Sequence, residues 1–256
     1  MFLAPLNIYE TDKLLAEYLL FHYGTAEEIL PYDFGPQNAL AYPVRCVTEC
    51  LDLARLPVDA HGLDLGCAVG RSTFELARYC AATIGIDSSR MFSEAATALQ
   101  RTGEFPYRRI DEGELYTPLI ARVPADINRQ RVVFETGDAM NLRRDLPPFD
   151  VVLMANLIDR LRDPGQCLER LPALVKSRGQ LIITSPSTWL EDFTPQANWV
   201  GGCVREGRAV TTAEGLEARL GQSFSLVLCK DLPFLIREHA RKFQWSVAQA
   251  TVWIRR

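Results

Sequence analysis

The sequence predicts an α/β domain with a doubly wound, seven-stranded and mostly parallel sheet, an antiparallel edge hairpin and an N-terminal helical lid. Three observations support this fold class. From about residue 61 onward, short apolar runs with the length of buried strands alternate with stretches of helical periodicity. Each of these helical stretches lies between two apolar runs, which is typical of parallel strands joined by right-handed crossovers. Two late apolar runs have no helix between them, and this favours an antiparallel pair at one edge of the sheet.

The expected elements follow in chain order. Residues 1–56 are expected to be helical and to form the lid, because apolar side chains recur there at helical spacing. The five core strands are expected at 62–65, 83–87, 131–136, 149–155 and 180–185, and the helices between them at 72–80, 89–101 and 163–176. Residues 102–130 are polar and rich in turn-forming residues, so we expect an insertion there. A helix at 212–220 then precedes the last two strands, at 224–229 and 246–254.

Composition and charge exclude several classes of protein. Hydrophobic residues make up 48% of the 256 residues and charged residues 23%, which excludes intrinsic disorder. The net charge is −4 and no basic stripe is present, so we expect no nucleic-acid partner. No apolar stretch approaches the roughly 20 residues that span a bilayer, and the start of the chain lacks the basic region of a signal peptide. We therefore expect neither a membrane partner nor export.

Seven cysteines are scattered through mostly apolar runs, and their odd number leaves at least one unpaired. Cys46 and Cys50 stand four residues apart on a predicted helix, but no second pair of cysteines or histidines completes a set of four metal ligands. We therefore expect no metal site. Reduced thiols are typical of the cytoplasm, which is where we expect the protein to be.

A glycine-rich turn follows the first predicted strand, in the string Asp64-Leu-Gly66-Cys67-Ala68-Val-Gly70. The strand ends near an acidic residue, the turn carries two glycines, and a helix begins directly afterwards. Glycines at such a turn let backbone N–H groups approach a ligand closely. Ala68 stands where a third glycine is common and is the smallest alternative. The turn alone is a weak signal, because many strand-to-helix turns carry glycine for packing.

Acidic residues at two further strand ends strengthen the prediction of a nucleoside site. Asp87 ends the second strand, is followed by Ser88, and is placed to accept hydrogen bonds from both hydroxyls of a ribose. Asp138 follows the third strand, where it can take an adenine amino group while the small Ala139 admits the ring. Asp64 places a negative charge near the middle of the ligand, which suits a sulfonium with an ammonium group better than a pyrophosphate. The pattern therefore favours S-adenosylmethionine over a nicotinamide dinucleotide as the cofactor.

Two levels of resemblance to known proteins accompany these motifs. The strings DLGCAVGRSTFELAR, GIDSS, GDAMNL and FDVVLMANLIDRL, within residues 61–190, resemble a class I S-adenosylmethionine-dependent methyltransferase with its Rossmann-like fold. Five further segments resemble the mercaptohistidine N-methyltransferase of ovothiol biosynthesis: YETDKLLAEYLLFHYG, LPYDFGPQNALAYPVRC, DEGELY, SPSTWLEDFTPQANWVGG and LPFLIREHARKFQWSVAQATVW. That family occurs as the C-terminal domain of a bifunctional sulfoxide synthase or as a separate protein.

The narrower resemblance implies methyl transfer to the ring nitrogen of 5-thiohistidine that lies beside the side-chain carbon, with a sulfoxide synthase as functional partner. Two alternatives stay open. In the first alternative, the acceptor is another small amine, thiol or carboxylate. In the second, the chain is a non-catalytic protein that senses S-adenosylmethionine or assists a synthase. The chain is either the methyltransferase alone or a fragment of the longer enzyme. In each case we expect one domain over 1–256, with a lid at 1–56, a cofactor-binding core at 61–190, and an acceptor-side loop with the antiparallel strands at 191–256.

Methyl transfer requires the acceptor, the methyl carbon and the sulfonium sulfur to lie in line, so the site needs groups that orient the substrate. Asn156, Asp159 and Arg160 follow the fourth strand, on the usual acceptor side. Asn156 is placed to bond the cofactor's amino acid part or the substrate ring. Asp159 is our candidate for the base or an ammonium partner and Arg160 for a carboxylate partner, with a solvated ion pair as the alternative. Arg45 either reaches the cofactor's carboxylate or is a surface arginine.

Aromatic residues complete the predicted site. Tyr9, Asp12 and Tyr23 lie in the lid, where tyrosines often close over the transferring methyl group, and Tyr9 is a second catalytic candidate. Trp189 and Trp199 flank the loop after the fifth strand and form either an aromatic wall for an imidazole ring or part of the core. We expect no histidine to act as the base.

Overall fold

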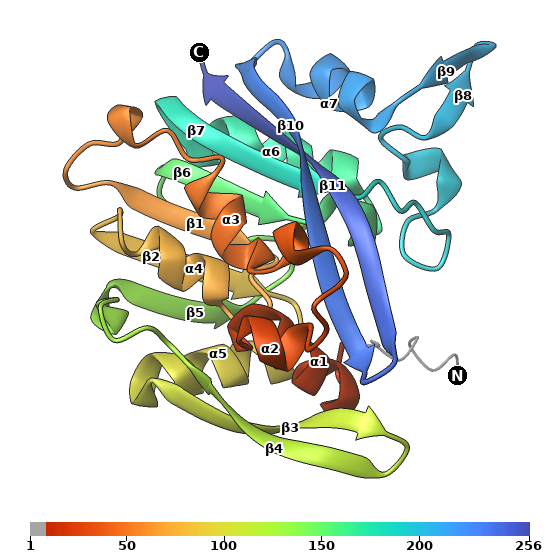
Figure 1. The fold of residues 1–256 in the computed structure, drawn as a ribbon. Coiled ribbons are helices and arrows are strands. Elements are labelled where there is room, and N and C mark those ends of the chain that lie inside the picture. The colour runs from red at the N-terminus through yellow and green to blue at the C-terminus, as the bar shows by residue number, and fades with distance from the viewer. Residues whose placement is uncertain (1–8) are drawn as a thin grey trace, which may run out of the picture.

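The central sheet has seven strands in the order β10–β11–β7–β6–β1–β2–β5, as the computed structural model of residues 9–256 shows (Figure 1). The strands are β1 (His61–Leu65), β2 (Ala82–Asp87), β5 (Val132–Thr136), β6 (Phe149–Ala155), β7 (Val175–Ser185), β10 (Phe224–His239) and β11 (Lys242–Arg255). The pairs β1–β2, β1–β6, β2–β5 and β6–β7 are parallel, whereas β11 is antiparallel to both β7 and β10. This arrangement confirms the predicted doubly wound sheet with an antiparallel edge hairpin.

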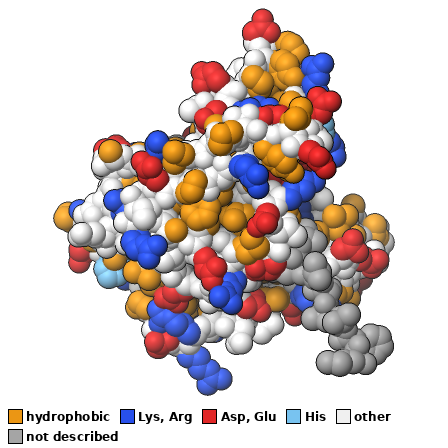
Figure 2. Space-filling view, turned by 90° about the horizontal axis from the view of Figure 1, so that it is seen from below, with side chains coloured by type: hydrophobic (Ala, Val, Ile, Leu, Met, Phe, Trp, Pro, Cys, Tyr) orange, Lys and Arg blue, Asp and Glu red, His pale blue; other side chains and the backbone are white. Residues whose placement is uncertain are grey.

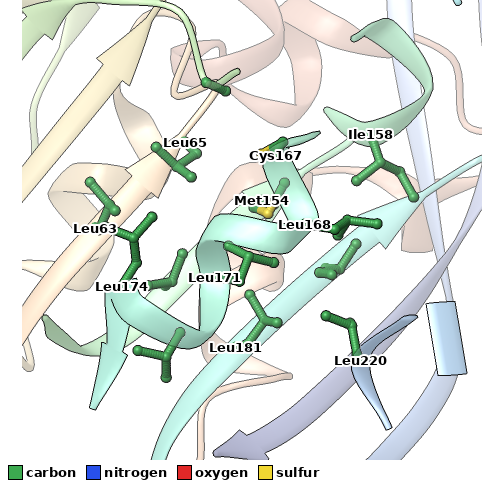
Figure 3. Close-up of a cluster of buried hydrophobic side chains, with 14 of the residues drawn as sticks. Leu63, Leu65, Met154, Ile158, Cys167, Leu168, Leu171, Leu174, Leu181 and Leu220 are labelled. Carbon is green, nitrogen blue, oxygen red and sulfur yellow. The ribbon is translucent and has the colours of Figure 1, made fainter. Parts of the chain in front are cut away.

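Helices cover both faces of the sheet, and the core strands are therefore apolar on both sides. In β6, Val152 and Met154 pack with Leu63 and Leu65 of β1 beneath α6 (Pro164–Leu174) and α7 (Thr212–Leu220), as Figure 3 shows for the side chains that it labels. The alternate residues of β6 face a second cluster, on the side of α3 (Tyr42–Thr48) and α4 (Arg71–Leu76). A strand alternates its side chains, so β6 contributes to two cores at once.

The crossover helix α5 (Arg90–Thr102) has clear start and stop signals. Ser89 caps its first turn by accepting a hydrogen bond from the backbone N–H of Phe92, and Gly103 ends it with a left-handed φ of 85°. Its apolar face packs on β2 and β5, which brings the turn after β2 to the carboxyl edge of the sheet.

The N-terminal segment is helical over its described part, as predicted. It comprises α1 (Asp12–Tyr23), α2 (Ala26–Ile29), α3 and the short 3-10 turns Gln37–Ala39 and Leu53–Arg55. Thr11 caps α1, and Thr25 with Glu28 forms a capping box for α2. Further 3-10 turns lie at Arg129–Arg131, Ile158–Arg160 and Gln196–Asn198.

Two segments differ from the expectation. The turn-rich insertion expected at 102–130 holds a hairpin of β3 (Glu104–Glu112) and β4 (Leu115–Arg122), because one of its faces, with Tyr107 and Ala121, packs into the cluster around α1 and α5. The edge hairpin is also longer than expected. Only Gln249–Ile254 of β11 pair with β7, so the tip of β10–β11 extends past the sheet toward α1 and β3. A small hairpin, β8 (Cys203–Arg205) with β9 (Arg208–Val210), lies in the loop after β7.

Charged groups of both signs are mixed on the face of the molecule that Figure 2 shows. On the face seen from below Figure 1, Lys and Arg side chains alternate with Asp and Glu and with hydrophobic ones (Figure 2). Among the helices of residues 9–256, none combines the length and the apolar character needed to cross a membrane.

Candidate functional site

The turn after β1 is held against β2 by its own backbone. The N–H groups of Gly66 and Cys67 both donate to the carbonyl oxygen of Ile86, at 2.8 and 3.2 Å. Gly66 and Gly70 have left-handed φ angles of 72° and 86°. A Cβ on Gly66 would lie 2.8 Å from a methyl carbon of Leu157, and one on Gly70 would overlap the ring of Phe134. The predicted glycines are thus required both by conformation and by close approach.

Asp64 is fully buried beneath this turn. Its Oδ2 accepts hydrogen bonds from Ser72 Oγ at 2.7 Å and Thr73 Oγ1 at 2.8 Å. Its Oδ1 is also buried but has no partner among the described residues. Burial raises the pKa of Asp64 to about 6. A buried carboxylate oxygen without a donor is costly, so a buried water molecule or a ligand group is needed to complete the hydrogen bonding of this atom.

Asp87, at the end of β2, binds the backbone on both sides of the turn. Its Oδ2 accepts from the N–H of Ala68 and its Oδ1 from the N–H of Ser89, both at 2.8 Å. Burial raises the pKa of Asp87 to about 6 as well, although the side chain is only half-buried. Each oxygen keeps one free lone pair, which is what a ribose diol needs. Ser88 beside it is exposed.

The third acidic residue follows β5 in register with the other two. The N–H of Gly137 donates to the carbonyl oxygen of Asp87 at 2.8 Å, which aligns the two strand ends. Asp138 is exposed, and its Oδ1 accepts from the N–H of Met140 at 2.9 Å. Ala139 is buried beside it. The structure therefore places the three predicted acids at the carboxyl ends of the neighbouring strands β1, β2 and β5.

Asp159 and Arg160 lie in the 3-10 turn Ile158–Arg160 after β6. Asp159 is fully buried: its Oδ1 accepts from Ser185 Oγ at 2.9 Å, and its Oδ2 accepts from the N–H of Thr188 at 3.2 Å and from Arg160 Nη1 at 2.8 Å. Burial raises its pKa, and the guanidinium of Arg160 opposes that rise. Asp159 and Arg160 thus form an internal ion pair that anchors the loop after β7. They do not form the solvated ion pair that was the alternative.

The N-terminal segment brings Tyr9 to this pair. The Tyr9 hydroxyl is hydrogen-bonded to Arg160 and to Tyr18, while burial raises its pKa. Its carbonyl oxygen accepts from Ser89 Oγ at 3.1 Å, which ties the start of the lid to the turn after β2. The two catalytic candidates, Tyr9 and Asp159, are therefore joined through Arg160.

Other lid residues face the glycine turn. The Tyr23 hydroxyl donates to the carbonyl oxygen of Val69 at 2.7 Å. His22 packs beside Tyr18 and Tyr23, and its Nδ1 is buried without a partner in the described structure. Burial and the nearby cation of Arg71 lower the pKa of His22 to about 3, so its ring is neutral. Sequence reasoning did not single out His22; the only signal was its place on the same helix face as Tyr18.

Some predicted residues are engaged elsewhere. Arg45 forms an ion pair with Glu49 at 2.6 Å and donates to the carbonyl oxygens of Asn38 and Pro233, which ties α3 to β10 and not to the glycine turn. Asp12 is exposed in the first turn of α1.

The two tryptophans stack on each other, with ring centroids 6.3 Å apart. Trp189 Nε1 donates to Thr212 Oγ1 at 2.9 Å, and Trp199 Nε1 donates to the carbonyl oxygen of Thr194 at 2.8 Å. Both rings pack on the core cluster beside α7. Their indole N–H groups are thus satisfied within the protein, as the core interpretation expects. Within residues 9–256, no group of His, Cys, Asp and Glu is arranged to hold a metal ion.

The comparisons with known proteins agree with this geometry. The model of a methyltransferase domain family matches residues 41–224, and the chain belongs to that family. No curated protein matches the sequence. An S-adenosylmethionine-dependent methyltransferase from Methanosarcina mazei superposes with a TM-score of 0.52 at 15% identity, over 79% of this chain and 95% of that one. The N-methyltransferase NodS from Bradyrhizobium japonicum, in complex with S-adenosylhomocysteine, gives 0.51 at 15% identity, over 94% and 98%.

The enzyme class follows from the family. The chain is an S-adenosylmethionine-dependent methyltransferase with a Rossmann-like fold, and S-adenosylmethionine is its cofactor. The substrate and the pathway are a separate question, because structural likeness at this identity concerns the fold alone.

Proposed function

We propose that this methyltransferase transfers the methyl group to a ring nitrogen of 5-thiohistidine, as in ovothiol biosynthesis. The support comes from the five segments that resemble the mercaptohistidine N-methyltransferase. Four of them supply parts of one assembly: α1, the chain that leads into α3, the β3–β4 turn and the tip of β10–β11 (Figure 1). In other methyltransferases of this fold, such parts outside the sheet differ with the substrate.

Hydrogen bonds join these segments. The N–H of Ala240 at the β10–β11 tip donates to the carbonyl oxygen of Asp111 in β3, at 3.0 Å, and Arg237 Nη2 donates to Asp111 Oδ1 at 3.2 Å. The Tyr32 hydroxyl donates to the carbonyl oxygen of Ala240 at 2.9 Å. The convergence of separately resembling segments on one assembly beside the strand ends is the observation that carries the proposal.

The described residues fit the cofactor. Asp64 Oδ1 is a buried acceptor that lacks a donor, and a ligand ammonium group provides one. Asp87 has a free lone pair on each oxygen for the ribose hydroxyls, and Asp138 with Ala139 offers an acceptor and a small neighbour for adenine. S-adenosylmethionine supplies a methyl group on a sulfonium, which the negative charge of these acids favours.

The remaining groups suit a zwitterionic acceptor. Arg160 is half-buried and lies between Asp159 and Tyr9, and by this proposal its guanidinium binds the amino acid carboxylate of the substrate. Tyr9 and Tyr18 provide aromatic edges on the lid side of the site. By this proposal the enzyme that supplies thiohistidine, a sulfoxide synthase, is the functional partner.

The test is one incubation of the protein with S-adenosylmethionine, 5-thiohistidine and histidine. We expect S-adenosylhomocysteine and a product 14 mass units heavier than thiohistidine, as one added CH₂ requires, with NMR placing the methyl group on the ring nitrogen beside the side-chain carbon. Equal turnover of histidine, or a methylthio product, would refute the proposal.

A matched pair of variants tests the carboxylate site. Arg160→Lys loses the planar fork that grips a carboxylate, so the KM for thiohistidine should rise about tenfold. Arg162→Lys, on an exposed arginine two residues along, should leave KM unchanged. Equal effects of the two substitutions would remove Arg160 from the site.

A further inference from the structure

His22 is a polar side chain whose hydrogen-bonding groups the fold does not use. Its ring lies in the last turn of α1 among aromatic neighbours, with its centroid 6.0 Å from that of Tyr18, 5.4 Å from Phe21 and 6.3 Å from Tyr23. Neither ring nitrogen makes a hydrogen bond within residues 9–256, and Nδ1 is fully buried. A buried nitrogen of this kind needs a partner from outside the fold, either a water molecule or a ligand.

One neighbour of His22 reaches the acceptor side of the site. Tyr18 stands one helical turn before His22 on the same face of α1, and its hydroxyl is hydrogen-bonded to that of Tyr9. Burial raises the pKa of Tyr18, and the charges of Arg160 and Asp87 shift that pKa in opposite directions, which places both groups near its hydroxyl. His22 therefore lies beside the ring that meets the guanidinium to which the proposed function gives the substrate carboxylate.

The other neighbour reaches the glycine turn. The Tyr23 hydroxyl donates to a backbone carbonyl oxygen of this turn at 2.7 Å. Burial and the nearby cation of Arg71 lower the pKa of His22 to about 3, so the ring is neutral. A neutral imidazole with unpaired nitrogens thus lies between the glycine turn on one side and the pair of Tyr9 and Arg160 on the other.

We propose that the ring of His22 accepts a hydrogen bond from the methyl acceptor and thereby decides which acceptor atom attacks. The proposal rests on the proposed function: in 5-thiohistidine, the bond comes from the N–H of the second ring nitrogen, which lies beside the sulfur-bearing carbon. A ring nitrogen attacks only with a free lone pair. A hydrogen held on the second nitrogen leaves that lone pair on the nitrogen beside the side-chain carbon, which is the predicted methylation site.

The step balances without proton transfer to His22. The lone pair of the attacking nitrogen forms the new N–C bond as the S–C bond of the donor breaks, and the electron pair of that bond stays on the donor sulfur. The acceptor ring gains one positive charge, so its remaining N–H becomes a stronger donor and its hydrogen bond to His22 strengthens in the transition state. The proton stays on the acceptor, and His22 is not the base.

The first test is steady-state kinetics of His22→Phe, which keeps an aromatic ring in place and removes both nitrogens. We expect kcat/KM for 5-thiohistidine to fall at least about tenfold, while the affinity for S-adenosylhomocysteine in calorimetry changes less than about threefold. His22→Asn returns a hydrogen-bonding group near the position of Nδ1 and should recover part of the loss. His61→Phe, on an exposed histidine at the start of β1, should change neither quantity. If S-adenosylhomocysteine affinity falls as much as kcat/KM, His22 belongs to the cofactor site and the proposal is overturned.

The second readout is the product. In His22→Phe the hydrogen of the substrate ring is no longer held on one nitrogen, so NMR should detect methyl groups on both ring nitrogens, whereas wild type gives one product. A single product from the variant would show that His22 does not select the attacking atom.

The stability of the same variant separates a ligand-binding role from a structural one. If the nitrogens of His22 serve a ligand, His22→Phe removes an unpaired buried nitrogen and should unfold at the same urea concentration as wild type or a higher one. If a water molecule bonds the ring as part of the fold, the variant leaves that water unpaired and unfolds at a lower concentration. A loss of stability that accompanies the loss of activity would therefore overturn the proposal.

The two proposals fail in different ways. If wild type does not methylate thiohistidine, the proposed function is wrong. The role of His22 is then tested with whichever acceptor turns over: His22→Phe should lower kcat/KM for that acceptor at least about tenfold and spare S-adenosylhomocysteine affinity. An unchanged kcat/KM would remove His22 from the acceptor site.

Discussion

Replacing Asp64 by asparagine removes a buried charge while keeping the shape of the side chain. The carboxyl group has an ordinary pKa of 3.8, and burial raises its pKa to about 6 in the folded protein. This difference corresponds to about 3 kcal/mol by which ionisation of Asp64 opposes folding at neutral pH. The pKa of the folded protein is the raised one, so the protonated carboxyl group avoids this penalty below pH 4. The corresponding stability is lost as the pH rises through about 6.

Asparagine does not titrate, so the difference in unfolding free energy between variant and wild type should depend on pH. Urea unfolding at pH 4 and pH 7.5 measures this difference. Any cost of the new amide that does not depend on pH cancels when the two pH values are compared. Part of the penalty is already present at pH 4, so we expect the difference to shift in favour of Asp64→Asn by about 2 kcal/mol at the higher pH. The same variant should bind S-adenosylmethionine more weakly. If the difference in unfolding free energy were equal at both pH values, Asp64 would not be a buried charge whose second oxygen lacks a donor within the protein.

Three further predictions concern the cofactor site. Affinity for S-adenosylmethionine should fall as the pH drops through about 6, since protonation of the acids removes the charge that favours a sulfonium. Asp87→Ala should lower this affinity about tenfold at pH 7.5. Calorimetry that gives a flat pH profile or an unchanged affinity would place the ribose elsewhere. Gly66→Val should lower the free energy of unfolding by about 2 kcal/mol or more, because its φ is left-handed and Leu157 occupies the space, and a variant of normal stability in urea would contradict the turn. A chelator should leave the rate of S-adenosylhomocysteine formation unchanged, whereas loss of the rate in chelator and recovery with a divalent ion would show a metal requirement.

The sheet and the positions of the three acids at the strand ends could be predicted because local sequence determines them. Buried parallel strands are apolar throughout, and the glycines of the turn are imposed by backbone angles that few other residues adopt. The acids at strand ends follow from the topology, since the carboxyl ends of parallel strands meet at one edge. Asp64, Asp87 and Asp138 needed no tertiary information beyond that.

The rest depends on contacts between distant segments. The β3–β4 hairpin was not predicted because Pro106 and Pro118 stand within its strands, and because its exposed face mixes charged residues with apolar ones such as Ile120. Whether Arg45 faces the turn or β10 depends on where Pro233 lies, 188 residues away. The contact between Tyr42 and Asn156 spans 114 residues and leaves no pattern in either segment.

The central claim is that this site directs the methyl group to the ring nitrogen of 5-thiohistidine that lies beside the side-chain carbon. A crystal structure with S-adenosylhomocysteine and 5-thiohistidine tests it most directly. We predict the ribose hydroxyls on Asp87, and the ring nitrogen beside the side-chain carbon as the acceptor atom nearest the thioether sulfur. An acceptor sulfur that points at the thioether, with the ring nitrogens turned away from it, would contradict the account.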